Sequence, residues 1–444
     1  MTPEPGAAVL ACSAGCAGGF PVFEAIYACP RCGALLDVRH DPAALGRRSG
    51  AEWRALFDSR GPASAWPLAS GVWGKREWVL PGLPDGDVVS LGEGWTSLVP
   101  APRAGAALGH ERLRVKQCGT SHSGSFKDLG MTVLVSAVRH RRRERGGPAA
   151  IACASTGDTS AALAAYSAAA GIPCAVLLPR GLVSPAQLVQ PLAHGARVLS
   201  LSTDFDGCMR IVKALAAEGT VYLANSMNPL RLEGQKTVAV ELAQQLSWTV
   251  PDWVFLPGGN LGNTAALCAG FTLARDLGLI DRLPRICVAQ SAAASPLYES
   301  FRRGFSSLTP VAAGPTAATA IRIGDPVSAP RALRALRACD GRVEEVGERA
   351  LAEAARLCAR AGLYPCPQTA VALAALRQAA AAGAVLPDEE VVVLATAHGL
   401  KFTEFEMAVA RGSLPGAQED VENVPIELPA ELAAVRAAIH EGAG

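Results

Sequence analysis

The residue best placed to do covalent chemistry is Lys127, in the polar segment Ser-His-Ser-Gly-Ser-Phe-Lys-Asp-Leu-Gly-Met at residues 121–131. An apolar helical pattern follows at once, so Lys127 stands at the start of a predicted helix, with Ser123 or Ser125 as N-cap. The positive end of a helix dipole disfavours an ammonium group, and an amine that sheds its proton there can form a Schiff base with a carbonyl. Taken alone, the pattern also fits a solvated loop lysine.

A second candidate site is the glycine-rich segment Pro-Gly-Gly-Asn-Leu-Gly-Asn at residues 257–263. It follows a short apolar run, 253–256, and a helical pattern begins near Thr264, so several backbone N–H groups would face a phosphate. The Gly-x-Gly-x-x-Gly fingerprint and the Lys-Ser/Thr of a P-loop are both absent. An imine-forming lysine with a separate phosphate site is what pyridoxal 5'-phosphate requires, and the sequence predicts that cofactor. A tight strand-to-helix turn is the alternative interpretation of this loop.

Four cysteines near the N-terminus have the spacing of a metal site: Cys12-x3-Cys16 and Cys29-x2-Cys32. Two close thiol pairs are typical of a zinc ribbon, in which each pair forms one knuckle. Four thiolates leave no open position on the metal, so such a zinc would be structural. The alternative is four free thiols in a flexible leader. The other nine cysteines lie singly in apolar surroundings and are predicted to be reduced and buried.

Four blocks of the sequence resemble the threonine synthases, and within them the plant-like branch of this pyridoxal-phosphate fold type II family. They are residues 121–131, Cys-Ala-Ser-Thr-Gly-Asp-Thr-Ser (153–160), Pro-Gly-Gly-Asn-Leu-Gly-Asn (257–263) and Thr-Ala-His-Gly-Leu-Lys-Phe (396–402). The similarity runs from about residue 51 to residue 402. The resemblance implies a homodimeric lyase of threonine biosynthesis that converts O-phospho-L-homoserine and water to L-threonine and phosphate by γ-elimination and β-addition.

The resemblance also assigns roles to individual residues. Lys127 would bind the cofactor and act as acid–base. Asp158 matches the position that bonds the cofactor's ring hydroxyl, where Asn is common elsewhere, and Thr396 matches the partner of the pyridine nitrogen. The cofactor phosphate would lie on the backbone amides of Gly259, Asn260, Leu261, Gly262 and Asn263. The substrate would contact Ser155, Thr156, Thr159, Asn225 and Arg231. Helix capping by Ser155 or Asp158, and an ordinary surface arginine at Arg231, are the competing interpretations.

Short β-like runs alternate with longer Ala-rich helical runs from Leu113 onward, which predicts parallel sheets covered by helices, with ligands at the carboxyl ends of the strands. The predicted strands are 113–116, 149–153, 175–178, 197–201, 221–224, 253–256, 285–289 and 391–395, and the predicted helices include 159–170, 232–246 and 431–440. The expected fold class is α/β, with two parallel-sheet domains of the tryptophan-synthase-β-like (fold type II) kind after a small zinc-ribbon-like segment. The basic run 139–145 is interpreted as a solvated helix end.

The expected organisation has five parts. They are a zinc-ribbon-like segment (1–45), an irregular tryptophan-containing layer (46–112), an α/β domain with the lysine and substrate loops (113–245), an α/β domain with the cofactor-phosphate loop (246–412) and a C-terminal tail (413–444).

The bulk composition restricts the possible partners. A formal charge of +1 gives no electrostatic reason to expect nucleic acid or an anionic membrane as partner. No apolar run is long enough to span a bilayer and the N-terminus does not look like a signal peptide, so a cytoplasmic protein with a small-molecule substrate is expected. Two rival functions remain. One is another fold type II lyase or β-replacing enzyme acting on a different amino acid, and the other is a silent descendant whose ribbon is an interaction module.

Overall fold

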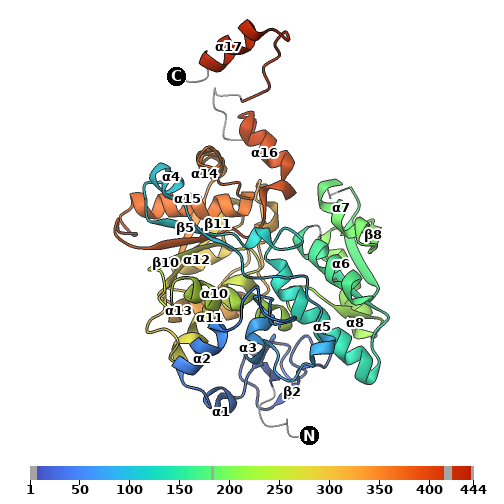
Figure 1. Ribbon diagram of the computed structural model, residues 1–444. Coiled ribbons are helices and arrows are strands. Elements are labelled where there is room, and N and C mark those ends of the chain that lie inside the picture. Colours follow the sequence, from blue (N-terminus) through green and yellow to red (C-terminus); the bar gives the residue numbers. More distant parts are fainter. Residues whose placement is uncertain (1–7, 156, 182–184, 415–422, 442–444) are drawn as a thin grey trace.

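The computed structural model describes residues 8–155, 157–181, 185–414 and 423–441, which form three β-sheets covered by helices (Figure 1). The N-terminal sheet is antiparallel and has the order β2-β1-β3, with β1 (Val9–Cys12), β2 (Gly19–Pro21) and β3 (Leu36–Arg39). A four-stranded parallel sheet has the order β8-β7-β6-β9, with β6 (Ala150–Ala154), β7 (Cys174–Pro179), β8 (Arg197–Leu201) and β9 (Val221–Leu223).

The largest sheet has six strands in the order β12-β11-β10-β13-β5-β4, and only its β4–β5 pair is antiparallel. Its strands are β4 (Leu98–Pro100), β5 (Leu113–Lys116), β10 (Trp253–Pro257), β11 (Arg285–Ser291), β12 (Arg342–Val346) and β13 (Val391–Leu394). The helices are α1 (Pro42–Leu45), α2 (Gly50–Asp58), α3 (Arg76–Val79), α4 (Pro102–Ala107), α5 (Lys127–Arg145), α6 (Asp158–Ala170), α7 (Pro185–Ala193), α8 (Phe205–Ala217), α9 (Leu230–Gln235), α10 (Thr237–Gln245), α11 (Gly262–Asp276), α12 (Pro296–Arg302), α13 (Ala329–Ala338), α14 (Glu348–Arg360), α15 (Pro367–Ala381), α16 (Thr403–Ala410) and α17 (Leu432–Glu441).

The central strands of both large sheets, such as β6 and β10, are buried on two faces, as their near-continuous apolar sequences predict. In β10, Phe255 packs in the cluster under α15, whereas its neighbour Val254 packs in the cluster that contains Leu267 and Phe271 of α11. The helices of these two layers lie on opposite sides of the sheet in Figure 1. The predicted α/β alternation is therefore confirmed.

The order of the strands in the chain does not reveal which strands belong to which sheet. β5 pairs with β13, so the six-stranded sheet combines residues 98–116 with residues 253–394, and the four-stranded sheet comes from residues 150–223. The domain limits at residues 113 and 246 stay predictions, and the pairing places β5 with the later strands. In the two large sheets, the strands β4 and β12 were missed, and both are edge strands. In β12, charged residues surround the buried Val343 and Val346.

The predicted single helix over residues 232–246 is wrong, because α9 and α10 are separate and meet at Lys236. The break lies beside a close helix contact. A Cβ on Gly234 would lie 1.6 Å from the Leu129 carbonyl oxygen of α5, and one on Gly130 would lie 2.8 Å from the Arg231 carbonyl oxygen. Only glycine allows the backbones of α5 and α9 to approach so closely, and this contact fixes the position of Lys127 relative to Arg231.

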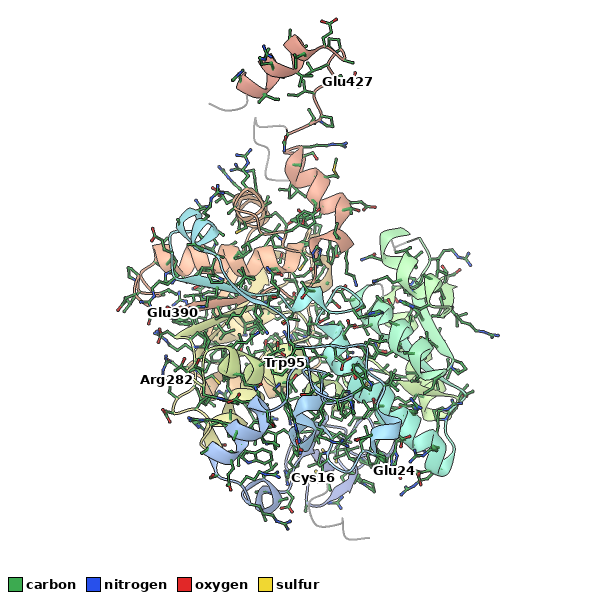
Figure 2. All side chains as sticks on the ribbon, viewed as in Figure 1. Cys16, Glu24, Trp95, Arg282, Glu390 and Glu427 are labelled. Atoms are coloured by element: carbon green, nitrogen blue, oxygen red, sulfur yellow. The ribbon has the colours of Figure 1, made fainter. Side chains whose placement is uncertain are left out.

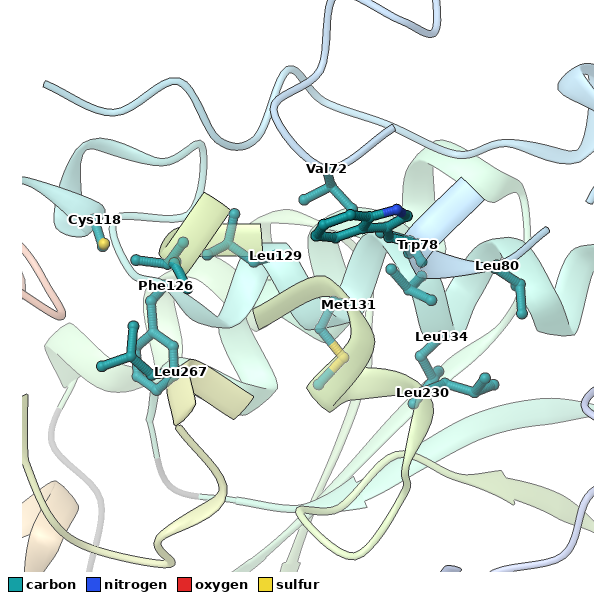
Figure 3. Close-up of a cluster of buried hydrophobic side chains, with 14 of the residues drawn as sticks. Val72, Trp78, Leu80, Cys118, Phe126, Leu129, Met131, Leu134, Leu230 and Leu267 are labelled. Atoms are coloured by element: carbon teal, nitrogen blue, oxygen red, sulfur yellow. The ribbon is translucent and has the colours of Figure 1, made fainter. Parts of the chain in front are cut away.

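The same helix pair encloses a dense apolar cluster, shown in Figure 3, where Met131 and Leu134 of α5 lie beside Leu230 of α9. All three side chains are buried. At its other end α5 stops at Arg145, followed by Gly146 with φ 69°, and Arg143 and Arg145 form ion pairs with acidic residues of other segments. The basic run 139–145 is therefore a helix end, as predicted.

The two ends of the described chain differ in their packing. The N-terminal sheet lies against the body near Cys16, whereas α17 and the segment around Glu427 stand apart from it (Figures 1 and 2). Within the described residues, no helix combines the length and the apolar character that crossing a membrane requires.

Candidate active site

Lys127 is the first residue of α5, as predicted, but the predicted caps are wrong. Phe126 is the N-cap and makes no side-chain capping bond. The backbone N–H of Ser123 donates to Asp128 at 2.7 Å and its hydroxyl donates to the same carboxylate, while Ser125 accepts only a long 3.4 Å bond from the Lys127 N–H. The serines therefore shape the loop before the helix.

The environment of Lys127 favours the uncharged amine. Its Nζ lies 3.9 Å from the centroid of the Phe126 ring. Burial and the positive charge of Arg231 lower the pKa of Lys127 to about 7, against the opposing charge of Asp158. A large fraction of the amine is then unprotonated near neutral pH, as nucleophilic attack on a carbonyl requires.

The glycine loop joins β10 to α11, whose N-cap is Leu261 with φ 62°. Val288 and Ile321 pack closely against the loop. A Cβ on Gly258 would lie 2.4 Å from Val288 Cγ1, and one on Gly259 would lie 3.1 Å from the Cα of Ile321. Larger residues at these two positions would push the loop out of place.

The loop contains hydrogen-bond donors that have no acceptor in the described part of the protein. Within the described residues, the backbone N–H groups of residues 259–264 donate to no protein acceptor. The hydroxyls of Thr264 and Ser328 are buried there without hydrogen-bond partners, and the Ser328 N–H holds the carbonyl of Asn260 at 3.1 Å. Unpaired donors at a helix N-terminus fit a phosphate dianion, so these residues suit the phosphate of the predicted cofactor.

Thr396 follows β13 and adjoins the lysine loop. Its carbonyl accepts the Phe126 N–H at 2.9 Å, and its own N–H donates to Thr369 Oγ1 at 3.1 Å. Among the described residues, the hydroxyl of Thr396 has only the Cys366 sulfur, at 3.8 Å, as a hydrogen-bonding neighbour. It is free to bond a ring nitrogen beside Lys127.

Asp158 begins α6 and forms an ion pair with Lys401 at 2.9 Å. Just before it, the Ser155 hydroxyl accepts the Gly157 N–H at 3.3 Å, so capping and ligand contact remain compatible there. Thr156 lies outside the described residues.

Arg231 is 2% exposed, and no carboxylate of the described chain pairs with it, so it is not an ordinary surface arginine. Its guanidinium donates to the Ala224 carbonyl at 3.0 Å and to Thr159 Oγ1 at 3.3 Å, and its Nε is buried without a partner. Burial lowers the pKa of Arg231 to about 10. The amide of Asn225 bonds the backbone of Ala154 twice, at 3.1 and 2.8 Å, and thereby holds the end of β6; its contact with the substrate stays a prediction.

The four N-terminal cysteines converge, with their sulfur atoms all within 4.8 Å of one another. Cys12 and Cys32 are 3.5 Å apart. The chemistry of this donor set fits a tetrahedral metal ion. The other nine cysteines are all buried free thiols, as predicted.

The N-terminal sheet that carries these cysteines is bonded to two helices of the body. Asp37 forms an ion pair with Arg331 of α13 at 2.6 Å. His40, which directly follows β3, bonds Glu233 of α9 at 2.6 Å, two residues after Arg231. The sheet is thus attached to the helix that carries the unpaired guanidinium.

Sequence reasoning missed several polar residues of the site: Lys401, Thr369, Thr264, Ser328 and Gln190. Lys401 lies within the block 396–402, and its charge beside apolar residues was an available signal. Thr264 follows the glycine loop directly. Nothing in the local sequence marks Ser328, Thr369 or Gln190, because only the tertiary fold brings them to the site.

Comparison with known proteins agrees with this geometry. The family described as pyridoxal-phosphate dependent enzyme matches residues 89–397. Chloroplastic threonine synthase 2 of Arabidopsis thaliana is 50% identical over 411 residues, covering 92% of this chain and 80% of the relative. Threonine synthase of Methanocaldococcus jannaschii is 40% identical over 387 residues, covering 87% of this chain and 91% of the relative.

Solved structures show the same fold at low identity. Diaminopropionate ammonia lyase of Escherichia coli superposes with a TM-score of 0.61 at 16% identity, covering 72% of this chain and 89% of that one. The processed threonine deaminase isoform 2 of Solanum lycopersicum gives 0.58 at 17% identity, covering 70% and 86%. The expectation of fold type II is confirmed at the level of the α/β body. Matching family, identity and fold place the chain among the pyridoxal-phosphate-dependent enzymes, where it belongs to the threonine synthases of the plant-like type.

Proposed function

We propose that this threonine synthase converts O-phospho-L-homoserine and water to L-threonine and phosphate, with pyridoxal 5'-phosphate bound at Lys127. The observation that carries the proposal is the pairing of two anion sites beside one lysine. The glycine loop suits the cofactor phosphate, and the unpaired Arg231 suits a second phosphate on the substrate.

The residues divide the work of binding and proton transfer. When bound, pyridoxal 5'-phosphate supplies an electron sink for the substrate's Cα. The amine of Lys127 removes and returns protons at the substrate carbon atoms. The Thr396 hydroxyl bonds the ring nitrogen without forcing it to stay protonated, and Asp158 accepts a hydrogen bond from the ring hydroxyl.

A second set of residues binds the phosphate of the substrate. Arg231 and Thr159, which already bond each other, hold the phosphate as it leaves Cγ and keep it near the site while water adds at Cβ. Ser155, in the loop between β6 and α6, contacts the substrate. Asn225 fixes the end of β6, and thereby positions the loop that contains Ser155.

The lowered pKa of Lys127 predicts a pH-dependent capture of the cofactor. Because only the free amine attacks, the rate at which protein stripped of cofactor rebinds it should rise about tenfold from pH 6 to pH 8 and then level off. Absorbance of the bound cofactor follows the reaction. Asp158→Asn removes the charge that raises this pKa, so the midpoint should move to lower pH. A rate that keeps rising to pH 10 would mean an ordinary lysine.

We propose further that Cys12, Cys16, Cys29 and Cys32 hold one structural zinc ion. The segment is too small to build a core of its own, so a tetrathiolate metal would supply much of its folding energy. The homodimer remains a prediction from the resemblance, and the cytoplasmic location a prediction from the sequence pattern.

Removal of this metal should loosen the N-terminal sheet and leave the chemistry of Lys127 in place. We expect about one zinc per chain in the purified protein, lost in Cys32→Ser, with Tm lower by about 5 °C or more. Elemental analysis separates zinc from iron, and calorimetry gives Tm. Protein that contains no metal and has an unchanged Tm in Cys32→Ser would refute the site.

A further inference from the structure

The ammonium group of Lys401 is fully bonded by three acceptors from three segments. It donates to the Ser123 carbonyl at 2.8 Å, to Asp158 Oδ1 at 2.9 Å and to Gln190 Oε1 at 3.0 Å. An ammonium has three N–H bonds, so every donor is used. The side chain is only 16% exposed, which limits competition from water.

These partners belong to both large sheets. Lys401 ends a short 3-10 turn, Gly399–Lys401, after β13, and Ser123 lies in the loop between β5 and α5, so both are supported by the six-stranded sheet. Asp158 follows β6, and Gln190 lies on α7 between β7 and β8, so both belong to the four-stranded sheet. Gln190 also donates to the Ser123 carbonyl at 3.0 Å. One lysine thus joins the two sheets where their ligand loops meet.

The stem of Lys401 is held as firmly as its charged end. It lies against Gly124, whose φ is +81°, and a Cβ there would come within 2.9 Å of Lys401 Cδ. The Gly124 carbonyl accepts the His398 N–H at 3.0 Å, which ties this loop to the turn that carries Lys401. Gly124 stands three residues before Lys127, so the contact reaches the loop of the reactive lysine.

We propose that Lys401 is a positioning residue that clamps α7 and the start of α6 against the loop of Lys127, holding the two sheets closed over the site. The proposal rests on the assignment of Lys127 as the reactive lysine. Lys401 has a second effect, since it balances the charge of Asp158. Without Lys401, the unopposed carboxylate of Asp158 would raise the pKa of Lys127. Arg231, the other charged group that faces this amine, would still lower that pKa.

The test uses the cofactor-loaded protein and three variants. Lys401→Met keeps the stem and removes the charge, and Lys401→Met with Asp158→Asn removes both charges. Lys213→Met, an exposed lysine on α8, makes the same substitution outside the clamp. Hydrogen exchange of backbone amides in α7 and α14, KM and kcat for O-phospho-L-homoserine, and the pH midpoint of cofactor capture are measured.

We expect Lys401→Met to speed exchange in α7 at least several-fold, to leave α14 unchanged and to raise KM about tenfold. The pH midpoint should rise in this variant and return toward the wild-type value in the double variant, which a purely structural role would not produce. Lys213→Met should behave as wild type. If Lys401→Met does not fold, Gln190→Ala, which removes one acceptor and no charge, should give the faster exchange in α7 and the higher KM in smaller measure.

Unchanged exchange in α7 would overturn the clamp, whatever the activity. A wild-type protein that forms no threonine would overturn the proposed function, while faster exchange in α7 of Lys401→Met would still support the clamp. The two failures are therefore separable.

Discussion

Lys127→Ala should abolish threonine formation, lowering kcat by roughly 10⁴-fold or more, because the variant loses both the covalent attachment of the cofactor and the acid–base group. The fold should survive. Burial and Arg231 already disfavour the charged amine, so its removal takes away an unfavourable group rather than a supporting contact. We expect Tm to stay the same or rise slightly, with cofactor still held at the glycine loop but exchangeable.

Two measurements separate loss of chemistry from loss of structure. Absorbance of the bound cofactor should lose the signature of its bond to lysine, and a small free amine such as ethylamine should restore part of the activity. Lys127→Arg keeps a positive charge and cannot form the bond, so it should be as inactive as the alanine variant. Activity within tenfold of wild type in either variant would show that another residue carries the reaction.

Arg231→Met should lower the activity and raise the stability of the substrate-free protein. Losing a buried guanidinium that binds the substrate phosphate should lower kcat/KM for O-phospho-L-homoserine by roughly 100-fold or more. The same change should stabilise the substrate-free protein. Folding lowers the pKa of Arg231 to about 10, so the charged form costs of the order of 3 kcal/mol at any pH below that value, and methionine removes the cost.

One control tests the planar shape of the Arg231 guanidinium. Arg231→Lys keeps the charge and loses the planar fork, so it should bind substrate with intermediate strength. Inorganic phosphate should inhibit wild type more strongly than Arg231→Met. Calorimetry of the substrate-free proteins checks the stability. A lower Tm together with an unchanged kcat/KM would assign Arg231 to structure alone.

The sequence predicted the parts of the site that are local. Lys127 at a helix start and the glycine loop after β10 depend on neighbouring residues, and both lie where the patterns indicated. The paired cysteines converge for the same reason, since each pair forms its own turn. The alternation of strands and helices fixed the α/β class because burial on both faces imposes continuous apolar strands.

What could not be predicted depends on contacts between distant segments. Ser123 was expected to cap a helix, but the fold gives it Asp128 as partner. The sequence did not predict that Asn225 also bonds Ala154, a contact that forms because β6 and β9 are neighbours in the sheet. Lys401 received no role, since its three acceptors come from segments far apart in the chain.

The central claim is that this chain forms threonine from O-phospho-L-homoserine. The most direct test gives that compound to the cofactor-loaded wild-type protein and measures phosphate and threonine together. We predict one threonine for each phosphate released. A yellow, cofactor-loaded protein that leaves the compound intact, or releases phosphate without forming threonine, would contradict the account and direct the search to another amino-acid substrate.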